Sequence, residues 1–417
     1  MAAPDERRGA IDVARVLALL VVVVGHLTIA VVDRGPDGAL RGANLLTLLP
    51  GWAWLGVLSP MPVFFAAGGW ANATATPRTA GPRLRLLVGL AVVVTTVWGL
   101  AVVVATLVSG SAGVLAQGAR VSTQPLWFLA AYLPLAVSGG WLARVAARRP
   151  VVAVGGCLLL LALLDLGRFW LGGPEWLGWP GFYAAWAVPW LVGGWWRARA
   201  LGGTGFRERR AGLVVVVGAG MAAFVLARYA GYHPSLIDVD EAARSNTTPP
   251  TLYTAVAALA QAGGLLVVAG ALDAWARRWR TLWDRLGDAA VAVYVWHLTA
   301  LSLCAAVIAA GLPVPERLTF GWWLTRPVWW LAILALTVGF VVATAPLRRV
   351  LGGDRRAGSR APVAAGAVAA ATAAFVGLRG PRTAALALLC IGGFALAWWL
   401  LGGRRLTATG DLDSTRS

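Results

Sequence analysis

The feature that most constrains the fold is a succession of apolar runs, 18 or more residues long, from one end of the chain to the other. A run of that length can cross the hydrocarbon core of a bilayer as a helix, and lipid-exposed backbone must satisfy its own hydrogen bonds. Of the 417 residues, 59% are hydrophobic and only 13% are charged, too few to cover the surface of a soluble domain. We therefore predict an all-α, polytopic transmembrane helix bundle.

Hydropathy predicts about twelve spans, of which the run at 362–378 is the least apolar. They lie near 11–33, 49–71, 86–109, 126–143, 150–170, 179–196, 211–231, 251–272, 288–310, 327–346, 362–378 and 384–402. Every one of the 36 basic residues is Arg. If the N-terminus is cytoplasmic, 25 arginines fall in inner segments, 8 in outer segments and 3 within spans. The positive-inside rule then predicts that both termini are cytoplasmic, in a multi-pass protein of the plasma membrane. The net charge of +18 is thus a topology signal, and we expect the lipid bilayer, not nucleic acid, as a partner.

The first apolar run, AIDVARVLALLVVVVGHLTIAVVD (10–33), carries Asp12, Arg15 and His26. A charge in hydrocarbon costs roughly 2.5–3.5 kcal/mol on insertion scales, so some function should offset that cost. Eleven helical residues turn about 20° past three full turns, which places Arg15 and His26 on one face, roughly 16 Å apart. Two plainer interpretations stay open: an Asp12–Arg15 pair that snorkels at the interface, and a helix–helix hydrogen bond for His26.

Further polar residues occur at a similar depth. His297 lies within VAVYVWHLTA, near the middle of its span, where a hydrogen bond between helices is the plainer interpretation. Several polar positions near the outer ends of spans predict a polar cavity open to the outer face, and they are candidates for binding a substrate. These are Asp165, Arg168, Arg228 and His233.

Several segments together resemble the acyltransferase-3 family of integral membrane acyltransferases. Arg15, ten intervening residues and His26 match its R-x10-H signature. MPVFFAAGGWAN (61–72), with Gly68 where Ser is usual, PRLRLL (82–87), PLWFLAAYL (125–133) and VYVWHL (293–298) resemble later segments of the family in the same order. RSNTTPPTL together with Gln261 (244–261) resembles an actinobacterial type of member.

The resemblance implies an O-acyltransferase that moves an acyl group, often acetyl, from cytoplasmic acyl-CoA to an extracytoplasmic acceptor. That acceptor is commonly a sugar hydroxyl of an envelope glycan. Members of the family have about ten spans. We therefore expect an acyltransferase domain at 10–350 and, at 351–417, an extension with two spans and a short cytoplasmic tail.

An imidazole can take the proton of the accepting hydroxyl or carry the acyl group as a nucleophile. We expect His26 to act in this way, with His297 as the second candidate. Arg15 would bind the donor or stabilise developing negative charge. Cationic contacts to the CoA phosphates would come from Arg78, Arg83 and Arg85, which can equally be plain topology charges. We expect acyl-CoA as a donor substrate, no permanently bound cofactor and no metal.

A rival interpretation is a proton-coupled secondary transporter, because twelve spans with buried Asp, Arg and His are common there. The two halves of the chain share no visible similarity, and the charges gather at the ends of spans, which favours the enzyme. A glycan flippase or scaffold is a third interpretation, and it would need neither a donor nor His26.

Overall fold

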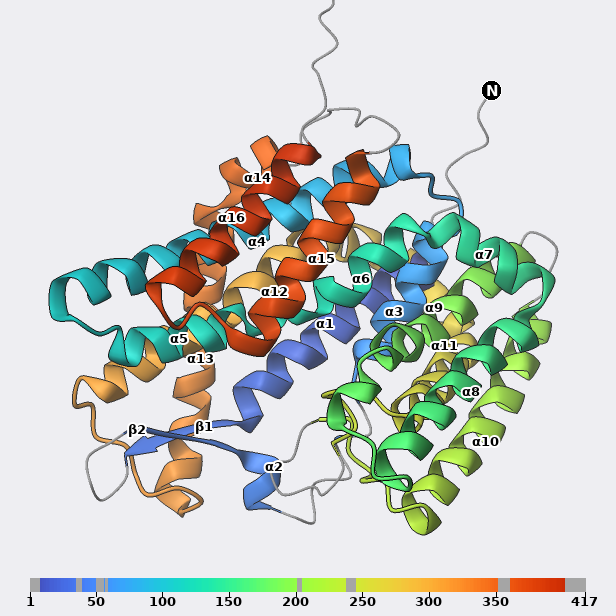
Figure 1. The fold of residues 1–417 in the computed structure, drawn as a ribbon, viewed down its shortest axis with the longest axis horizontal. Coiled ribbons are helices and arrows are strands. Elements are labelled where there is room, and N and C mark those ends of the chain that lie inside the picture. The colour runs from blue at the N-terminus through green and yellow to red at the C-terminus, as the bar shows by residue number, and fades with distance from the viewer. Residues whose placement is uncertain are drawn as a thin grey trace, which may run out of the picture.

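A computed structural model describes residues 8–34, 40–49, 56, 59–200, 205–237, 245–351 and 361–401. The chain is almost entirely helical (Figure 1). The first half contains α1 (Gly9–Ile29), β1 (Ala30–Arg34), β2 (Leu40–Asn44), α2 (Leu45–Leu48), α3 (Met61–Asn72), α4 (Pro77–Ser109), α5 (Gly113–Thr123), α6 (Trp127–Val137), α7 (Gly139–Arg148) and α8 (Pro150–Phe169). The second half contains α9 (Gly181–Ala200), α10 (Gly205–Tyr229), α11 (Leu252–Arg278), α12 (Arg280–Ala309), α13 (Phe320–Ala343), α14 (Ala345–Leu351), α15 (Ala361–Arg379) and α16 (Ala384–Leu400).

The helices confirm a polytopic α-helical membrane protein. Among the described residues, eight helices are long and apolar enough to cross a membrane. A ninth span results if the pair Gly113–Val137 and Gly139–Arg148, which bends by 68°, is one broken span. The remaining predicted spans correspond to α3, α9 and the 17-residue helix α16, so the number twelve stays a prediction.

The bend between α6 and α7 has a local cause. Pro134 lacks the N–H that a helix interior requires, and the backbone turns at Ser138 four residues later. Gly139 and Gly140 then pass close to the end of α3. A Cβ added at Gly139 would lie 2.9 Å from the carbonyl oxygen of Asn72, and one added at Gly140 would lie 2.6 Å from that of Ala75. The predicted span at 126–143 is therefore a kinked segment.

The first predicted span differs from the structure at the outer end of α1. The run predicted at 11–33 is helical only to Ile29, after which β1 pairs antiparallel with β2, with Val32 opposite Gly42. Within the second run, predicted at 49–71, the structure describes helix α3 at Met61–Asn72, and residues 50–55, 57 and 58 lie outside the described residues. Hydropathy missed the hairpin because the β-branched Val31 and Val32 are as apolar as a membrane helix; the hairpin is a small addition to an all-α bundle.

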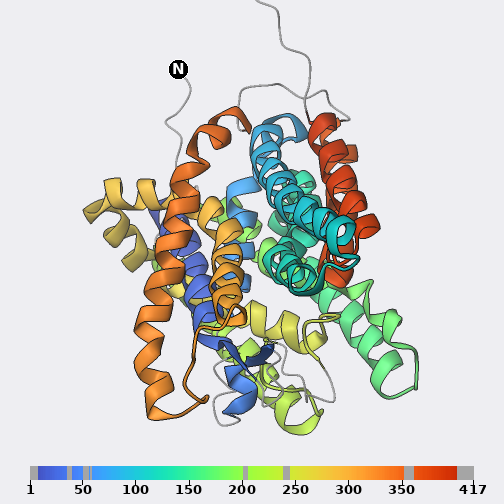
Figure 2. The same ribbon diagram turned by 90° about the vertical axis from the view of Figure 1, so that its left-hand side faces the viewer.

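Helix α1 lies at the centre of the molecule and packs against α3, α11 and α12 (Figure 1). Helices α15 and α16 lie against α6 and α4, and the side view shows α16 next to α4 (Figure 2). On the opposite side α8 and α10 form the periphery, with α9 and α11 between them and α3. The arrangement holds one face of α1 against α12, which positions the site described below.

The close contact of α3 with α9 accounts for Gly68, where the resembling segment usually has Ser. A Cβ at Gly68 would lie 2.7 Å from the indole of Trp190, which is almost fully buried. At Gly69 the carbonyl oxygen of Trp190 itself would clash with a Cβ. The bulk of Trp190 thus occupies the space that a serine side chain would need.

Candidate functional site

His26 and His297 meet between α1 and α12. The Nδ1 atom of His26 lies 2.7 Å from Nε2 of His297, which is hydrogen-bond distance. The two ring planes differ by 3° and their centroids are 5.1 Å apart. His297 is fully buried and His26 is half-buried. The structure thus brings together the two histidines that the sequence indicated, although 271 positions separate them.

His297 is held from its other side by Tyr294, one turn earlier on α12. Its Nδ1 atom lies 2.7 Å from the backbone carbonyl oxygen of Tyr294. The Tyr294 hydroxyl in turn donates to the carbonyl oxygen of Pro125 at 2.9 Å, and its ring packs edge-on against Phe128 with centroids 5.0 Å apart. Both ring nitrogens of His297 therefore have partners, and the ring is fixed in place.

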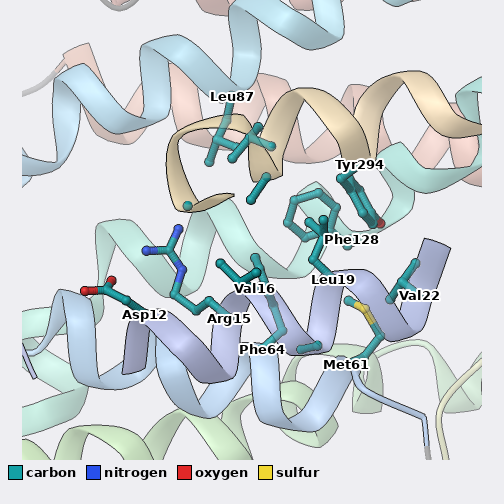
Figure 3. Close-up of a pocket in the computed structure, with 14 residues that line it drawn as sticks. Asp12, Arg15, Val16, Leu19, Val22, Met61, Phe64, Leu87, Phe128 and Tyr294 are labelled. Carbon is teal, nitrogen blue, oxygen red and sulfur yellow. The ribbon is translucent and has the colours of Figure 1, made fainter. Parts of the chain in front are cut away.

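A narrow, mainly apolar cavity lies along α1 (Figure 3). Its volume is about 40 Å³, and it extends from Asp12 and Arg15 past Leu19 to Val22 and Tyr294. Val22 lies one helical turn before His26, and Tyr294 lies one turn before His297. The cavity thus links the Arg15 end of the R-x10-H signature to the neighbourhood of its His26 end.

The narrow cavity adjoins a larger one of about 480 Å³, and the two share Asp12, Arg15 and Phe64 among their lining residues. A volume of this size is typical of a site for a small molecule or cofactor. Charged side chains of both signs line it, and two indoles stand beside them. These residues are Arg8, Arg15, Arg197, Arg348, Asp12, Asp284, Asp288, Trp70 and Trp283.

Arg15 and Asp12 do not form the ion pair that their spacing suggested. Within the part of the chain that the structure describes, neither side chain has a hydrogen bond or a salt bridge. Figure 3 shows the Arg15 guanidinium extending from α1 at the mouth of the narrow cavity, with Leu19 and Val22 further along the helix. Both charged groups are therefore available to a ligand.

Arg8 fixes the start of α1 beside this cavity. Its guanidinium donates to both carboxylate oxygens of Glu208, at 3.0 and 2.8 Å, and to Asp273 at 2.9 Å. Asp273 also accepts the backbone N–H of Ala10 at 2.7 Å, and the Arg8 guanidinium lies 4.6 Å from the ring centroid of Trp196. Three helices, α1, α10 and α11, are thereby tied together next to Arg15.

The arginines predicted to bind CoA phosphates lie on α4. The side chains of Arg78 and Arg83 fall outside the described residues. Arg85 is buried, donates from Nε to the carbonyl oxygen of Leu351 at 3.2 Å, and lies 4.4 Å from the ring centroid of Trp398. It lines neither cavity, so the structure places it at the contact of α4 with α14 and α16.

The predicted outer substrate residues form a separate cluster at the ends of α8 and α11. Asp165 is buried, accepts the hydroxyl of Tyr232 at 2.9 Å, and accepts the first backbone N–H of α11, from Leu252, at 2.7 Å. Arg168 lies 3.6 Å from Asp165 and 2.6 Å from Glu175. The contacts of Asp165 hold α11 and the preceding loop in place, and they do not bring it to the histidine pair.

The other two predicted outer residues are near the surface. Arg228 is exposed at the end of α10, beside the ring of Tyr229. His233 is half-buried in the loop that follows, where its Nδ1 accepts the backbone N–H of Ser235 at 3.1 Å. Burial lowers the pKa of His233. Neither residue lines the two cavities at α1.

Sequence reasoning missed several residues of the cavities. Tyr294 had a usable signal, because it lies three positions before His297 and so shares its helix face. Arg197 and Arg348 were counted only as topology charges, although both line the larger cavity. Trp283 had no distinguishing signal among the 23 tryptophans of the chain. Its place at the cavity depends on the packing of α12 beside α1.

Comparisons with known proteins agree with the segments quoted above. A search of curated proteins and a search of solved structures gave no match. The model of the acyltransferase-3 family, described as an acyltransferase domain, matches residues 8–346, which include both histidines and all the residues named as lining the cavities except Arg348. With its apolar helices and this match over most of its length, the chain belongs to the acyltransferase-3 family and is a multi-pass membrane acyltransferase.

Proposed function

We propose that the protein transfers an acyl group, acetyl in the first instance, from cytoplasmic acyl-CoA to a hydroxyl of an extracytoplasmic glycan or glycosylated acceptor. The observation that carries the proposal is the His26–His297 pair one helical turn beyond Val22 and Tyr294, which line the same cavity as Arg15. A helix–helix hydrogen bond alone would explain the pair, but it would need neither the nearby cavity nor an Arg15 that has no side-chain partner among the described residues.

The donor would enter from the end at which α1 begins. The larger cavity has the size of a ligand site, and Arg15, Arg197 and Arg348 line it. Guanidinium groups bind phosphate oxygens through charge-assisted hydrogen bonds, and Trp283 offers an aromatic face to an adenine ring. We assign the contacts with the CoA phosphates to these arginines in place of Arg85.

The narrow cavity would take the slender part of the donor. It follows α1 from Arg15 to Val22, and seven helical residues correspond to roughly 10 Å along the axis. Its lining by Leu19, Met61 and Phe64 suits an uncharged chain, not a phosphate. A donor with its phosphates near Arg15 would then present its thioester close to His26.

In the reaction that we propose, His26 acts as the general base. A neutral imidazole nitrogen removes the proton of the acceptor hydroxyl while the oxygen bonds to the acyl carbon. The bond from that carbon to sulfur breaks, and the CoA thiolate takes the proton back from His26. The products are an ester and CoA with a free thiol, and no further reactant is needed.

The sidedness of the reaction depends on the orientation of the chain. We propose that both termini are cytoplasmic and that about twelve segments cross the membrane, because the arginines concentrate in every second connection. A reporter fused after residue 417 would then be active on the cytoplasmic side. Reporter activity only on the outer side would contradict this topology.

The test is label transfer by the purified full-length protein in lipid nanodiscs. The protein is incubated with radiolabelled acetyl-CoA and a panel of glycoside and lipid-linked saccharide acceptors, and the label that is released by hydroxylamine is counted as ester. We expect transfer by the wild type and at least a 100-fold loss in His26→Ala, since general base catalysis typically contributes about 10²–10⁴-fold.

The matched control is Val24→Ala, an exposed position two residues away on α1. It should transfer at the wild-type rate. Full transfer by a His26→Ala protein that purifies and melts normally would overturn the mechanism. Flux of a labelled solute through proteoliposomes, with no ester formed, would instead favour a transporter.

A further inference from the structure

We infer that His297 is a positioning residue that fixes the tautomer of His26, so that Nε2 of His26 is the atom that receives the proton of the acceptor. The inference deepens the function proposed above and rests on it for the role of His26. The hydrogen-bond pattern behind it can be tested without any activity.

The argument starts at the backbone carbonyl oxygen of Tyr294. A carbonyl oxygen only accepts hydrogen bonds, so Nδ1 of His297, 2.7 Å away, must carry the hydrogen. A neutral imidazole has one protonated and one bare nitrogen. Nε2 of a neutral His297 is therefore bare and can only accept.

The same logic continues to His26. Its Nδ1 lies 2.7 Å from the bare Nε2 of His297, so Nδ1 of His26 carries the hydrogen and donates it. In a neutral His26 the other nitrogen, Nε2, is then bare. The carbonyl of Tyr294 thus determines, through two successive hydrogen bonds, which nitrogen of His26 can accept a proton.

The reverse hydrogen bond, from His297 to His26, is unfavourable for neutral rings. If Nε2 of His297 donated to His26, the bare Nδ1 of His297 would lie 2.7 Å from the lone pairs of the Tyr294 carbonyl. Only a doubly protonated His297 would avoid that repulsion, and His297 is fully buried among apolar residues of α12, such as Val295 and Leu298. Burial therefore favours two neutral rings, in which Nδ1 of His26 donates to His297 and Nδ1 of His297 donates to the Tyr294 carbonyl.

The two successive hydrogen bonds have consequences for the transfer step. The hydroxyl proton goes to Nε2 of His26, the acceptor oxygen bonds to the acyl carbon, and the carbon–sulfur bond breaks. While His26 is an imidazolium, its Nδ1–H remains donated to His297, which stabilises the charge. The proton on Nε2 then passes to the leaving thiolate, and the original tautomer is restored.

Nitrogen NMR of the wild-type protein tests the tautomers directly, because the chain has only three histidines. We expect protonated Nδ1 in His26 and His297 of protein labelled with ¹⁵N-histidine. His233 serves as the internal comparison: its Nδ1 accepts the N–H of Ser235, so its Nε2 should be protonated. His233→Gln should remove the one signal that comes from a histidine with a protonated Nε2. A protonated Nε2 in neutral His26 would overturn the inference.

Two substitutions at position 297 separate positioning from packing. Glutamine can place an amide oxygen near the position of Nε2 and accept from His26, whereas leucine fills the space without an acceptor. We expect His297→Leu to lower kcat about 10- to 100-fold with little change in KM for acyl-CoA, as for removal of a group that orients a functional histidine. The His26 signal should shift to protonated Nε2 in this variant.

His297→Gln should recover most of the lost kcat and keep Nδ1 of His26 protonated. Equal losses in the two variants, with the tautomer of His26 unchanged, would contradict the positioning role. The NMR result for the wild type stands even if a variant fails to fold. If the protein shows the expected tautomers but no transferase activity, the hydrogen-bond chain is supported and the proposed function is rejected.

Discussion

Arg15 and His26 both face α12 from α1: the first lines the narrow cavity together with Gly287 of α12, and the second is in contact with His297. Eleven residues correspond to roughly 16 Å of helix, so about three turns of α1 separate the guanidinium of Arg15 from the imidazole of His26. This relationship gives the R-x10-H spacing a physical meaning. One end would bind the charged part of a donor, and the other would meet its reactive part.

Arg15→Gln should therefore weaken donor binding while it leaves His26 intact. Hydrogen bonds to charged groups contribute about 1.5–3 kcal/mol, so we expect KM for acyl-CoA to rise about 10- to 100-fold. Steady-state kinetics at saturating acceptor would measure the change. The control is Arg277→Gln, an exposed arginine at the end of α11. An unchanged KM in Arg15→Gln would show that Arg15 does not contact the donor.

The narrow cavity, of about 40 Å³, predicts that a bulkier side chain in its lining would block the donor. Ala290 lines this cavity, and leucine in its place would add three carbon atoms to the filled volume. We expect Ala290→Leu to lower kcat/KM for acetyl-CoA at least 10-fold, because the side chain would exclude the slender part of the donor.

The matched control is Ala306→Leu on the exposed side of the same helix, which should behave as the wild type. An unchanged kcat/KM for acetyl-CoA in Ala290→Leu would contradict the size argument.

The sequence was sufficient for the class of fold and it indicated both histidines, but it could not predict their contact or several others. Hydropathy predicts helices because the bilayer requires them, and it indicated the long apolar ones but not α2, α5 or most of α14. The end of the first span was wrong because Val31 and Val32 are apolar in a strand and a helix alike. Asp165 was read as a substrate ligand because its partner, the N–H of Leu252, is 87 residues away. Nothing local distinguishes an aspartate that caps a distant helix from one that binds a ligand.

Arg85 is the clearest case of this ambiguity, and it leads to a discriminating experiment. Its guanidinium lies over Trp398, so Arg85→Met and Trp398→Leu should each lower the melting temperature and leave KM for acyl-CoA unchanged. The lost cation–π contact and hydrogen bond correspond to about 2–3 kcal/mol for a desolvated site. Trp399→Leu, next to it but 71% exposed, is the control that should melt as the wild type does.

The role predicted for Arg85 from the sequence would give the opposite result. If Arg85 bound a phosphate of the donor at the surface, its replacement would raise KM for the donor and leave the melting temperature unaltered. Arg85→Lys adds a further distinction, since lysine keeps the charge but loses the planar group that stacks on an indole. We expect Arg85→Lys to melt close to Arg85→Met and below the wild type.

His233 should make stability depend on pH in the loop between α10 and α11. Burial lowers its pKa from the ordinary 6.5, and its Nδ1 must be bare to accept the N–H of Ser235. The unfolded chain therefore takes up this proton at a higher pH than the folded protein does. The sign follows: the contribution is fully present above about pH 6.5 and is lost as the pH falls below it. Melting curves in nanodiscs between pH 5 and pH 8 should show a smaller drop on acidification for His233→Gln than for the wild type, whereas parallel curves for the two proteins would exclude His233 as the titrating group.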